Sequence, residues 1–386
     1  MTTLSVLVSL ASVIVFQRIT KKLIISMIAG FAIFAAINRQ IIFGFSRLFL
    51  ASISDISFIT LLPSIFLIYF LGELMNVSKD ADHFSSSVQK LFQDTRSAAV
   101  LMPAIVGLMP MPAGAMFTAP IVDQIGTDMD NLQKTTVNYW FRHCLEFFWP
   151  VYPAMYLLSS LVNMPLGIIS LKLSPLFVIS FLIGWIYLNG FTLPKVRRIQ
   201  KEDWKKMWPL LMILSTGFMI LIFKIDGWLA LLITSSFYAI IRIKFVWRSL
   251  INSFKRMDIV PVLLVVFLYK HSMIDLGIGQ RMSSELSRAG LGMLVISIVL
   301  PLVIGMSTGL TSGAVGVYLP IVVGMGVNNL AIIVYVFSVI GVLLSPVHLC
   351  LVLTCQYFKV DFLKVLKRVF VPIITVAISA VLLYSW

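Results

Sequence analysis

Long apolar runs separated by short basic loops cover the chain from one end to the other. Examples are the runs from Leu210 to Phe223 and from Val369 to Tyr384. A bilayer core about 30 Å thick requires roughly 20 mostly apolar residues per spanning helix. The pattern therefore predicts an all-α integral membrane protein without a soluble domain. The first run, Leu4 to Phe16, has neither a preceding basic stretch nor a small-residue cleavage site, so we expect a retained helix and not a signal peptide.

The order of the runs repeats along the chain at an offset of 198 residues. The matched pairs include Pro63 with Pro261, Pro103 with Pro301, and Gly107 with Gly305. Several prolines and glycines in one register, flanked by the same order of runs, indicate a duplication. We predict a first repeat over 1–193, a cytoplasmic basic linker over 194–206 and a second repeat over 207–386.

Each repeat is predicted to contain two spans, a third span, an amphipathic arm, an apolar segment interrupted by Gly and Pro, and two further spans. In the first repeat these segments are about 4–16, 23–37, 57–75, 80–96, 97–126, 132–160 and 166–190. In the second they are about 207–223, 227–241, 259–274, 277–288, 289–326, 329–357 and 366–385.

The two interrupted segments, 97–126 and 289–326, decide the topology. If both span the membrane, the 30 Lys and Arg residues divide 15 to 15 between its two sides. If both return to the side from which they entered, 23 basic residues lie on one side and 7 on the other. Cytoplasmic loops carry an excess of Lys and Arg, so we predict two re-entrant hairpins.

This topology has ten spans and two hairpins, with both termini outside. Each repeat then contributes five spans, and an odd number inverts the second repeat relative to the first. Inverted repeats are typical of many secondary transporters.

Composition supports the membrane assignment, since 59% of the residues are hydrophobic and only 12% are charged. We attribute the net charge of +14 to the sidedness of the loops, and aromatic-basic nucleic-acid motifs are absent, so no nucleic-acid partner is expected. Cys144, Cys350 and Cys355 show neither a disulfide framework nor metal-ligand spacing. We expect no cofactor and no metal other than Na⁺ as a coupling ion.

The tips of the hairpins are the first candidate site. Non-helical backbone at membrane depth is tolerated only where protein buries it or where it lines a cavity. Carbonyls and hydroxyls there suit a hard cation such as Na⁺, and helix N-terminal amides suit an anion. The alternative is that Pro and Gly only kink helices for packing. The predicted substrate-binding residues of this region are Pro112, Ala113, Gly114, Thr118, Thr311, Ser312 and Gly313.

The helix after each hairpin is predicted to break at a proline, Pro150 in FFWPVYP and Pro346 in LLSPVHL. Arg142 and Glu146 precede the first break with a spacing of four, which places them on one helical face. Either they form an ion pair at the cytoplasmic interface, or Arg142 contacts an anionic solute at a buried site. The predicted coupling-ion or proton residues are Ser307, Thr308, Glu146, His143, Ser345 and His348.

Other charged residues have simpler interpretations. A packed, neutral histidine is the alternative for His348. Asp123 is interpreted as a charge at the end of the first hairpin, and Lys270 and His271 as side chains that snorkel from the end of a span.

Three stretches carry a resemblance to a known family, namely GLMPMPAGAMFTAPIVDQIG, NYWFRHCLEFFWPVYP and SPVHLCLVLT. Over most of the chain, the sequence resembles the prokaryotic membrane family named domain of unknown function 401. In layout it is similar to the ion transporter superfamily, which includes sodium-coupled dicarboxylate carriers. That similarity implies a prokaryotic inner-membrane protein, a homodimer, and elevator movement of hairpins and broken helices against a scaffold.

The dicarboxylate carriers have a Ser-Asn-Thr motif at each tip, whereas this chain has Pro-Ala-Gly at 112–114 and Thr-Ser-Gly at 311–313. Dicarboxylate specificity therefore does not follow from the resemblance.

The leading functional hypothesis is a secondary transporter for a small, carboxylate-like anion coupled to Na⁺ or H⁺. An uncoupled channel or exchanger with the same site is the second hypothesis. The third is an intramembrane enzyme that uses His143 or His348 with Glu146 or a tip serine. We do not predict an enzyme, because no nucleophile, base and orienting group have sequence support and neither a zincin motif nor a nucleophile elbow is present. No nucleotide-binding loop is present, so direct ATP drive is not expected.

Overall fold

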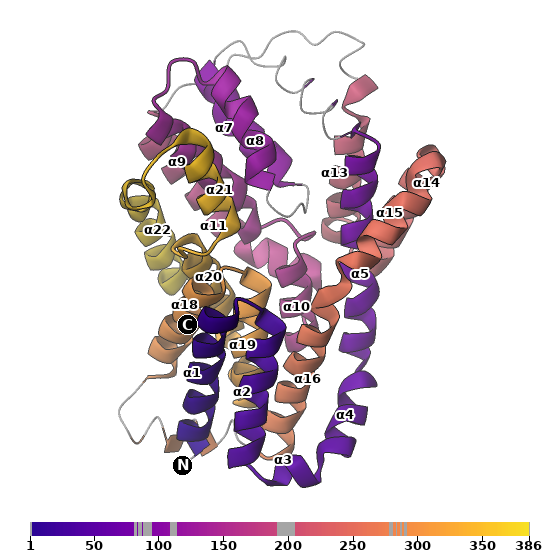
Figure 1. The fold of residues 1–386 in the computed structure, drawn as a ribbon, viewed down its shortest axis with the longest axis vertical. Helices are drawn as coiled ribbons and strands as arrows, with labels where there is room; N and C mark the ends of the chain where they lie inside the picture. Colours follow the sequence, from indigo (N-terminus) through magenta and orange to yellow (C-terminus); the bar gives the residue numbers. More distant parts are fainter. Residues whose placement is uncertain are drawn as a thin grey trace.

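A computed structural model provides the structure, and every element in its described residues is a helix (Figure 1). The described residues are 2–80, 95–108, 114–190, 205–277 and 292–385, with the isolated positions 83, 87, 281, 282, 284, 285 and 288. The predicted linker at 194–206 and the predicted arms at 80–96 and 277–288 lie largely outside them.

The first part of the chain forms ten α-helices and one short 3₁₀ helix among the described residues. They are α1 (Thr2–Thr20), α2 (Leu23–Ile37), α3 (Gln40–Phe43), α4 (Phe45–Ile53), α5 (Ile56–Val77), α7 (Thr95–Gly107), α8 (Gly114–Ile125), α9 (Asn131–Cys144), η1 (Leu145–Phe147), α10 (Pro153–Val162) and α11 (Leu166–Asn189).

The second part forms nine α-helices and two short 3₁₀ helices among the described residues. Its described helices are α13 (Trp208–Leu221), α14 (Gly227–Ile241), α15 (Ile243–Lys255), η2 (Met257–Ile259), α16 (Val260–Asp275), α18 (Met293–Thr308), α19 (Thr311–Gly324), η3 (Asn328–Leu330), α20 (Ala331–Leu343), α21 (Leu349–Phe358) and α22 (Phe362–Tyr384).

Local sequence accounts for several helix boundaries. The Asp55 side chain accepts a hydrogen bond from the Ser57 amide and caps the start of α5. Asp130 caps α9 in the same way. An aspartate in this position satisfies an amide that has no partner inside the helix. At its other end, α11 stops at Gly190, whose left-handed backbone (φ +76°) is readily adopted by glycine.

The chain is a multi-pass membrane protein. Five helical segments in the described residues are long and apolar enough to cross a bilayer. The other predicted spans correspond to apolar helices of 10–17 residues, except that the first half of the predicted span 132–160 forms α9, which is not one of them. Large apolar side chains are also exposed on outer helices such as α14 and α22, where lipid would cover them. The five long segments are Thr3–Thr20, Ile56–Val77, Leu166–Asn189, Ile243–Asp275 and Phe362–Tyr384.

The sequence prediction missed the short helices α3, α4 and α15. α3 and α4 are too short, and α15 is too short and too charged, to give the long apolar run of a span. α15 contains Lys244, Arg248 and Lys255 within 13 residues. Its buried positions are serines, and Trp247 is exposed, a composition that suits a helix lying along the membrane interface. Phe45 and Ile243, at the starts of α4 and α15, differ by the same 198 residues as the predicted repeats.

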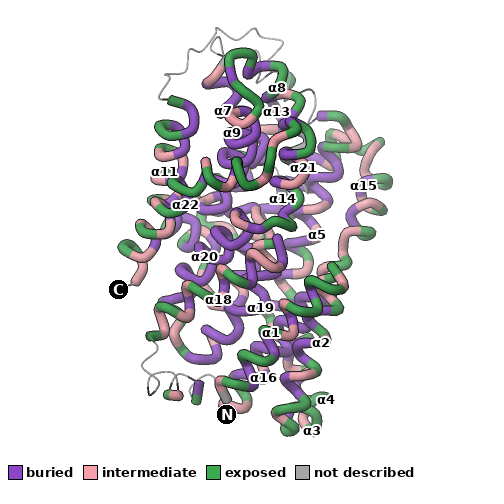
Figure 2. Tube along the Cα trace, turned by 60° about the vertical axis from the view of Figure 1, so that its left-hand side comes forward, coloured by how far each residue is buried: buried purple, intermediate pink, exposed green. Residues whose placement is uncertain are grey.

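Helix packing follows the same plan in the two parts of the chain. α1 packs on α2 as α13 packs on α14, and α7 packs on α9 as α18 packs on α20. Contacts between the two parts also occur in matching pairs. α4 of the first part packs on α16 of the second, and α15 of the second part packs on α5 of the first. α9 and α20 form the interior, and every residue of α20 is buried (Figure 2).

Lys270 and His271 do not snorkel, which corrects the sequence interpretation. Lys270 Nζ lies 2.9 Å and His271 Nε2 lies 3.0 Å from the same carboxylate oxygen of Asp55. Asp55 is available because it caps α5, and the packing of α16 beside α5 brings the two ends together. Asp123 is also paired, since its carboxylate lies 2.7 Å from Lys134 Nζ.

Candidate functional site

Both helices that were expected to break are interrupted. α9 ends at Cys144, continues as the 3₁₀ turn η1, and the chain resumes a helix at Pro153. α20 ends at Leu343 and α21 begins at Leu349. We call the segments 145–152 and 344–348 the first and second breaks. The first break starts two residues earlier than the FFWPVYP motif suggested, because η1 already departs from α-helical geometry.

The first break holds the end of α7. The last carbonyls of an α-helix have no partner within the helix. Here three successive carbonyls at the end of α7 accept hydrogen bonds from side chains of α9 and the first break. Arg142 Nη1 donates to the Val106 carbonyl at 2.9 Å, Tyr152 Oη to Gly107 at 2.6 Å, and Trp149 Nε1 to Leu108 at 3.1 Å.

The second break holds the join between α18 and α19 in a similar way. Gly309 ends α18 with a left-handed backbone (φ +66°). Ser345 Oγ donates to the Met306 carbonyl at 2.7 Å. His348 Nδ1 lies 2.9 Å from the Gly309 carbonyl. Each break therefore replaces the backbone partners that the end of a neighbouring helix lacks.

A cavity of about 240 Å³ lies where the two breaks meet the start of α19. Six predicted site residues line it, namely Arg142, His143, Glu146, Thr311, Ser312 and His348. The structure therefore brings Thr311 and Ser312 of the second tip close to Arg142, His143 and Glu146. The cavity is also lined by Tyr69, Tyr152, Pro153, Ala154, Gly309, Leu310, Leu349 and Cys350.

Glu146 connects the first break to the second tip. Its Oε2 accepts a hydrogen bond from Thr311 Oγ1 at 2.9 Å, and its Oε1 lies 3.9 Å from His143 Nε2. Tyr335 Oη donates to its backbone carbonyl at 2.7 Å. Arg142 and Glu146 are only 5% and 9% exposed. Of the two interpretations of this pair, the structure therefore supports a buried site at the helix break.

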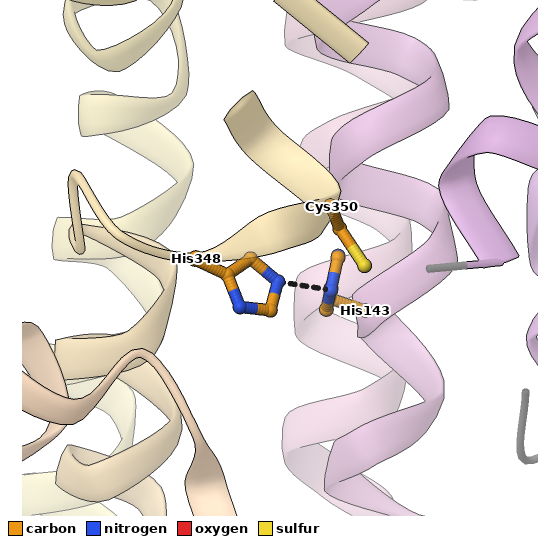
Figure 3. Close-up of side chains that lie close together, drawn as sticks. All are labelled: His143, His348 and Cys350. Atoms are coloured by element: carbon orange, nitrogen blue, oxygen red, sulfur yellow. Dashed lines mark hydrogen bonds between the residues drawn. The ribbon is translucent and has the colours of Figure 1, made fainter. Parts of the chain in front are cut away.

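His143 and His348 both line the cavity, and their rings face each other (Figure 3). Their Nε2 atoms are 3.0 Å apart. His143 Nδ1 lies 2.7 Å from the Tyr139 carbonyl, so both rings have a backbone oxygen at Nδ1. Cys350 lies next to the pair, and one ligand atom from each of the three side chains lies within 4.8 Å of the others. The cysteines had shown no metal-ligand spacing in sequence, because this cluster forms only when α9 meets α21.

Four of the predicted residues that do not line the cavity make contacts elsewhere. Thr118 hydrogen-bonds to Asn138 between α8 and α9. Gly313 faces Leu23 of α2, where an added Cβ would lie 3.0 Å from its side chain. Ser307 donates to the Val303 carbonyl, and Thr308 donates to Leu310 within its own turn. These four residues do not line the cavity, because the direction of each side chain depends on helix rotation, and their assignment to a site stays a prediction.

The remaining predicted residues have mixed outcomes. Ser345 does not line the cavity and instead holds α18, as described above. Pro112 and Ala113 lie outside the described residues. Gly114 begins α8.

The sequence prediction missed Tyr69, Tyr152 and Cys350 as lining residues. Tyr152 lies inside the FFWPVYP motif and Cys350 two residues after His348, so both were within the recognised stretches. Their importance was not visible because only the crossing of the breaks turns them toward the same space. Tyr69 of α5 had no local signal at all.

A family described as a protein of unknown function, DUF401, matches residues 3–385. The chain belongs to this family. The match confirms the resemblance drawn from the three sequence stretches, and the matched region includes both breaks. No curated protein matches the chain.

Proposed function

We propose that this DUF401 member is a secondary active transporter that moves a small anionic, carboxylate-like solute by alternating access, coupled to H⁺ or Na⁺. One observation carries the proposal. A cavity at the crossing of two interrupted helices is lined by a buried arginine, a buried glutamate and two buried histidines. Ionisable groups inside a membrane protein are costly to bury, and they mark ion or solute pathways.

Repeated packing supports an inverted duplication. Glu73 of α5 and His271 of α16 are 198 residues apart. His271 pairs with Asp55, just before α5, and Glu73 pairs with Arg256, just before α16, at 2.5 Å. One ion pair joins the start of α5 to the end of α16, and the other joins the end of α5 to the start of α16. A two-fold axis in the membrane plane that relates α5 to α16 would produce two such contacts.

We interpret α7–α8 and α18–α19 as the two re-entrant hairpins. They lie toward opposite ends of the long axis in Figure 1. The end of α7 contacts the first break and the start of α19 lines the cavity, so both hairpins point to the crossing. Hairpins and broken helices would then move together against a scaffold that contains α5 and α16, as in an elevator, in a homodimer in the prokaryotic inner membrane with both termini outside.

Arg142 and Glu146 receive different roles. The Arg142 guanidinium lines the cavity and is the group we assign to the solute anion. Glu146, together with His143 and His348, is assigned to the coupling ion, because these groups gain or lose a proton or offer ligands to a cation. Thr311 links Glu146 to the second tip, so ion binding and tip position are connected.

The test is uptake by reconstituted liposomes under imposed Na⁺ or H⁺ gradients, screened over carboxylates and inorganic anions. We expect accumulation of one anion class under one gradient, with loss in Arg142→Ala and loss of gradient dependence in Glu146→Gln. Arg47→Lys is the control, because its ion pair with Asp275 includes no residue that lines the cavity. Failure to accumulate any solute under either gradient would refute the proposal, and currents far above carrier turnover would favour a channel.

A further inference from the structure

We propose that His143, His348 and Cys350 form a binding site for a thiophilic transition-metal cation such as Zn²⁺. The three side chains come from α9, the second break and α21, and their ligand atoms lie within 4.8 Å of one another. The site lies at the crossing of the two broken helices and lines the cavity. It does not depend on the transport proposal, because it rests on the side-chain cluster alone.

The orientation of the two histidines is the first argument. Both Nδ1 atoms lie within 2.9 Å of a backbone carbonyl oxygen, which can only accept a hydrogen bond. Each neutral ring then carries its proton on Nδ1 and presents an unprotonated Nε2. These two lone pairs point at each other over 3.0 Å. Two acceptors at that distance repel unless they share a proton or a metal cation, and a metal cation satisfies both nitrogens and the neighbouring Cys350 sulfur together. A carbonyl at Nδ1 is also the usual outer-shell partner of a metal-bound histidine.

The donor set is the second argument. Two imidazole nitrogens and one thiolate match Zn²⁺, which binds nitrogen at about 2.0–2.1 Å and sulfur at about 2.3 Å. Tetrahedral ligands at these lengths lie roughly 3.3–3.7 Å apart. The histidine nitrogens are near this separation already, and Cys350 would need to approach by about 1 Å, which a change in χ1 provides. On binding, the thiol proton of Cys350 would pass to water.

The surroundings of the cluster are the third argument. Glu146 Oε1, 3.9 Å from His143 Nε2, is the nearest carboxylate and offers a fourth ligand. With a thiolate and a carboxylate, the site carries two negative charges against a divalent cation. The cavity also leaves one side of the cluster open, so a metal ion has a path to the ligands.

The experiment uses the full-length protein, purified in detergent and stripped with a chelator. It is titrated with Co²⁺, which reports thiolate ligation through a sulfur-to-metal charge-transfer absorption, and the Co²⁺ is then displaced by Zn²⁺. We expect saturation at one ion per chain, with the charge-transfer band present. Cys350→Ser should abolish the band and weaken Co²⁺ binding at least tenfold, and His143→Gln and His348→Gln should weaken it at least as strongly.

Cys355→Ser is the matched control, because Cys355 is also buried on α21 but lies outside the cluster. It should bind Co²⁺ as the wild type does. The proposal is overturned if the wild type shows no saturable thiolate band, or if the band persists in Cys350→Ser. It is also overturned if the histidine variants, folded by their melting profile, bind Co²⁺ normally. Transport is not measured, so failure of the transport proposal would leave this result unchanged.

Discussion

Gly341→Ala should loosen the packing of the second hairpin on its broken helix. Gly341 of α20 faces the backbone of Leu302 in α18. A Cβ built at Gly341 would lie closer than 3.0 Å to the Leu302 carbonyl oxygen and 2.9 Å from its carbonyl carbon. These are backbone atoms, so no side-chain rotation relieves the overlap, and α18 itself must move.

The magnitude follows from two opposing effects. Restoring ordinary contact requires a shift of about 1 Å, which separates the packed surfaces of α18 and α20, and overpacking of this kind costs roughly 1–3 kcal/mol. Since the blocking atoms are backbone, we take the upper value of about 3 kcal/mol. Alanine recovers about 1 kcal/mol of helix propensity, which leaves a net destabilisation of about 2 kcal/mol. For a chain of this size, that corresponds to a fall in Tm of about 2–4 °C.

Thermal unfolding of the purified protein in detergent measures this effect. Gly305→Ala approaches the same interface from α18, where its Cβ would lie 2.6 Å from the Ser338 carbonyl oxygen, so it should also lower Tm. The double variant should lose less than the sum, because one movement of α18 relieves both overlaps. Gly292→Ala is the control, since nothing lies within 4 Å of its added Cβ. A Tm for Gly341→Ala equal to or above that of the wild type would refute the reasoning.

Three further predictions concern polar contacts. Asp80→Asn should lower Tm by several degrees. Asp80 is buried and accepts hydrogen bonds from Arg242 at 2.6 and 2.7 Å, and breaking a buried ion pair costs about 3 kcal/mol. An unchanged Tm would contradict this prediction. Burial alone raises the pKa of Asp80, but the hydrogen bonds from Arg242, Ser78 and Tyr238 lower it below its ordinary value of 3.8. The stabilisation is therefore present above about pH 4 and lost as the pH falls through the lower folded-state pKa, so the Tm difference between wild type and Asp80→Asn should vanish on acidification. Thr311→Val keeps the shape of the side chain but removes the donor to Glu146, so it should lower the free energy of unfolding by about 1.5–3 kcal/mol and lower Tm. Thr311→Ser keeps the donor and should leave Tm unchanged. Equal Tm values for the two variants would exclude this contact.

The pattern of apolar runs was sufficient for the coarse fold. A bilayer imposes a length on apolar helices, so the runs identified the long helices from Ile56 and from Leu166 within a few residues. Proline removes a backbone donor wherever it stands, so the interruptions around Pro150 and Pro346 were visible locally. Short charged helices such as α15 were missed, because their stability comes from packing and not from a local pattern.

The sequence by itself determined which segments are apolar and where two of the helices are interrupted, because these depend on residue chemistry within one turn or one span. Only the tertiary structure decided which side chains share the cavity. Arg142 and His348 are separated by 206 positions, and their meeting depends on how two broken helices cross and how each is rotated about its axis. The same crossing places Cys350 beside the two histidines and leaves Thr118 and Gly313 elsewhere, a selection that depends on long-range packing.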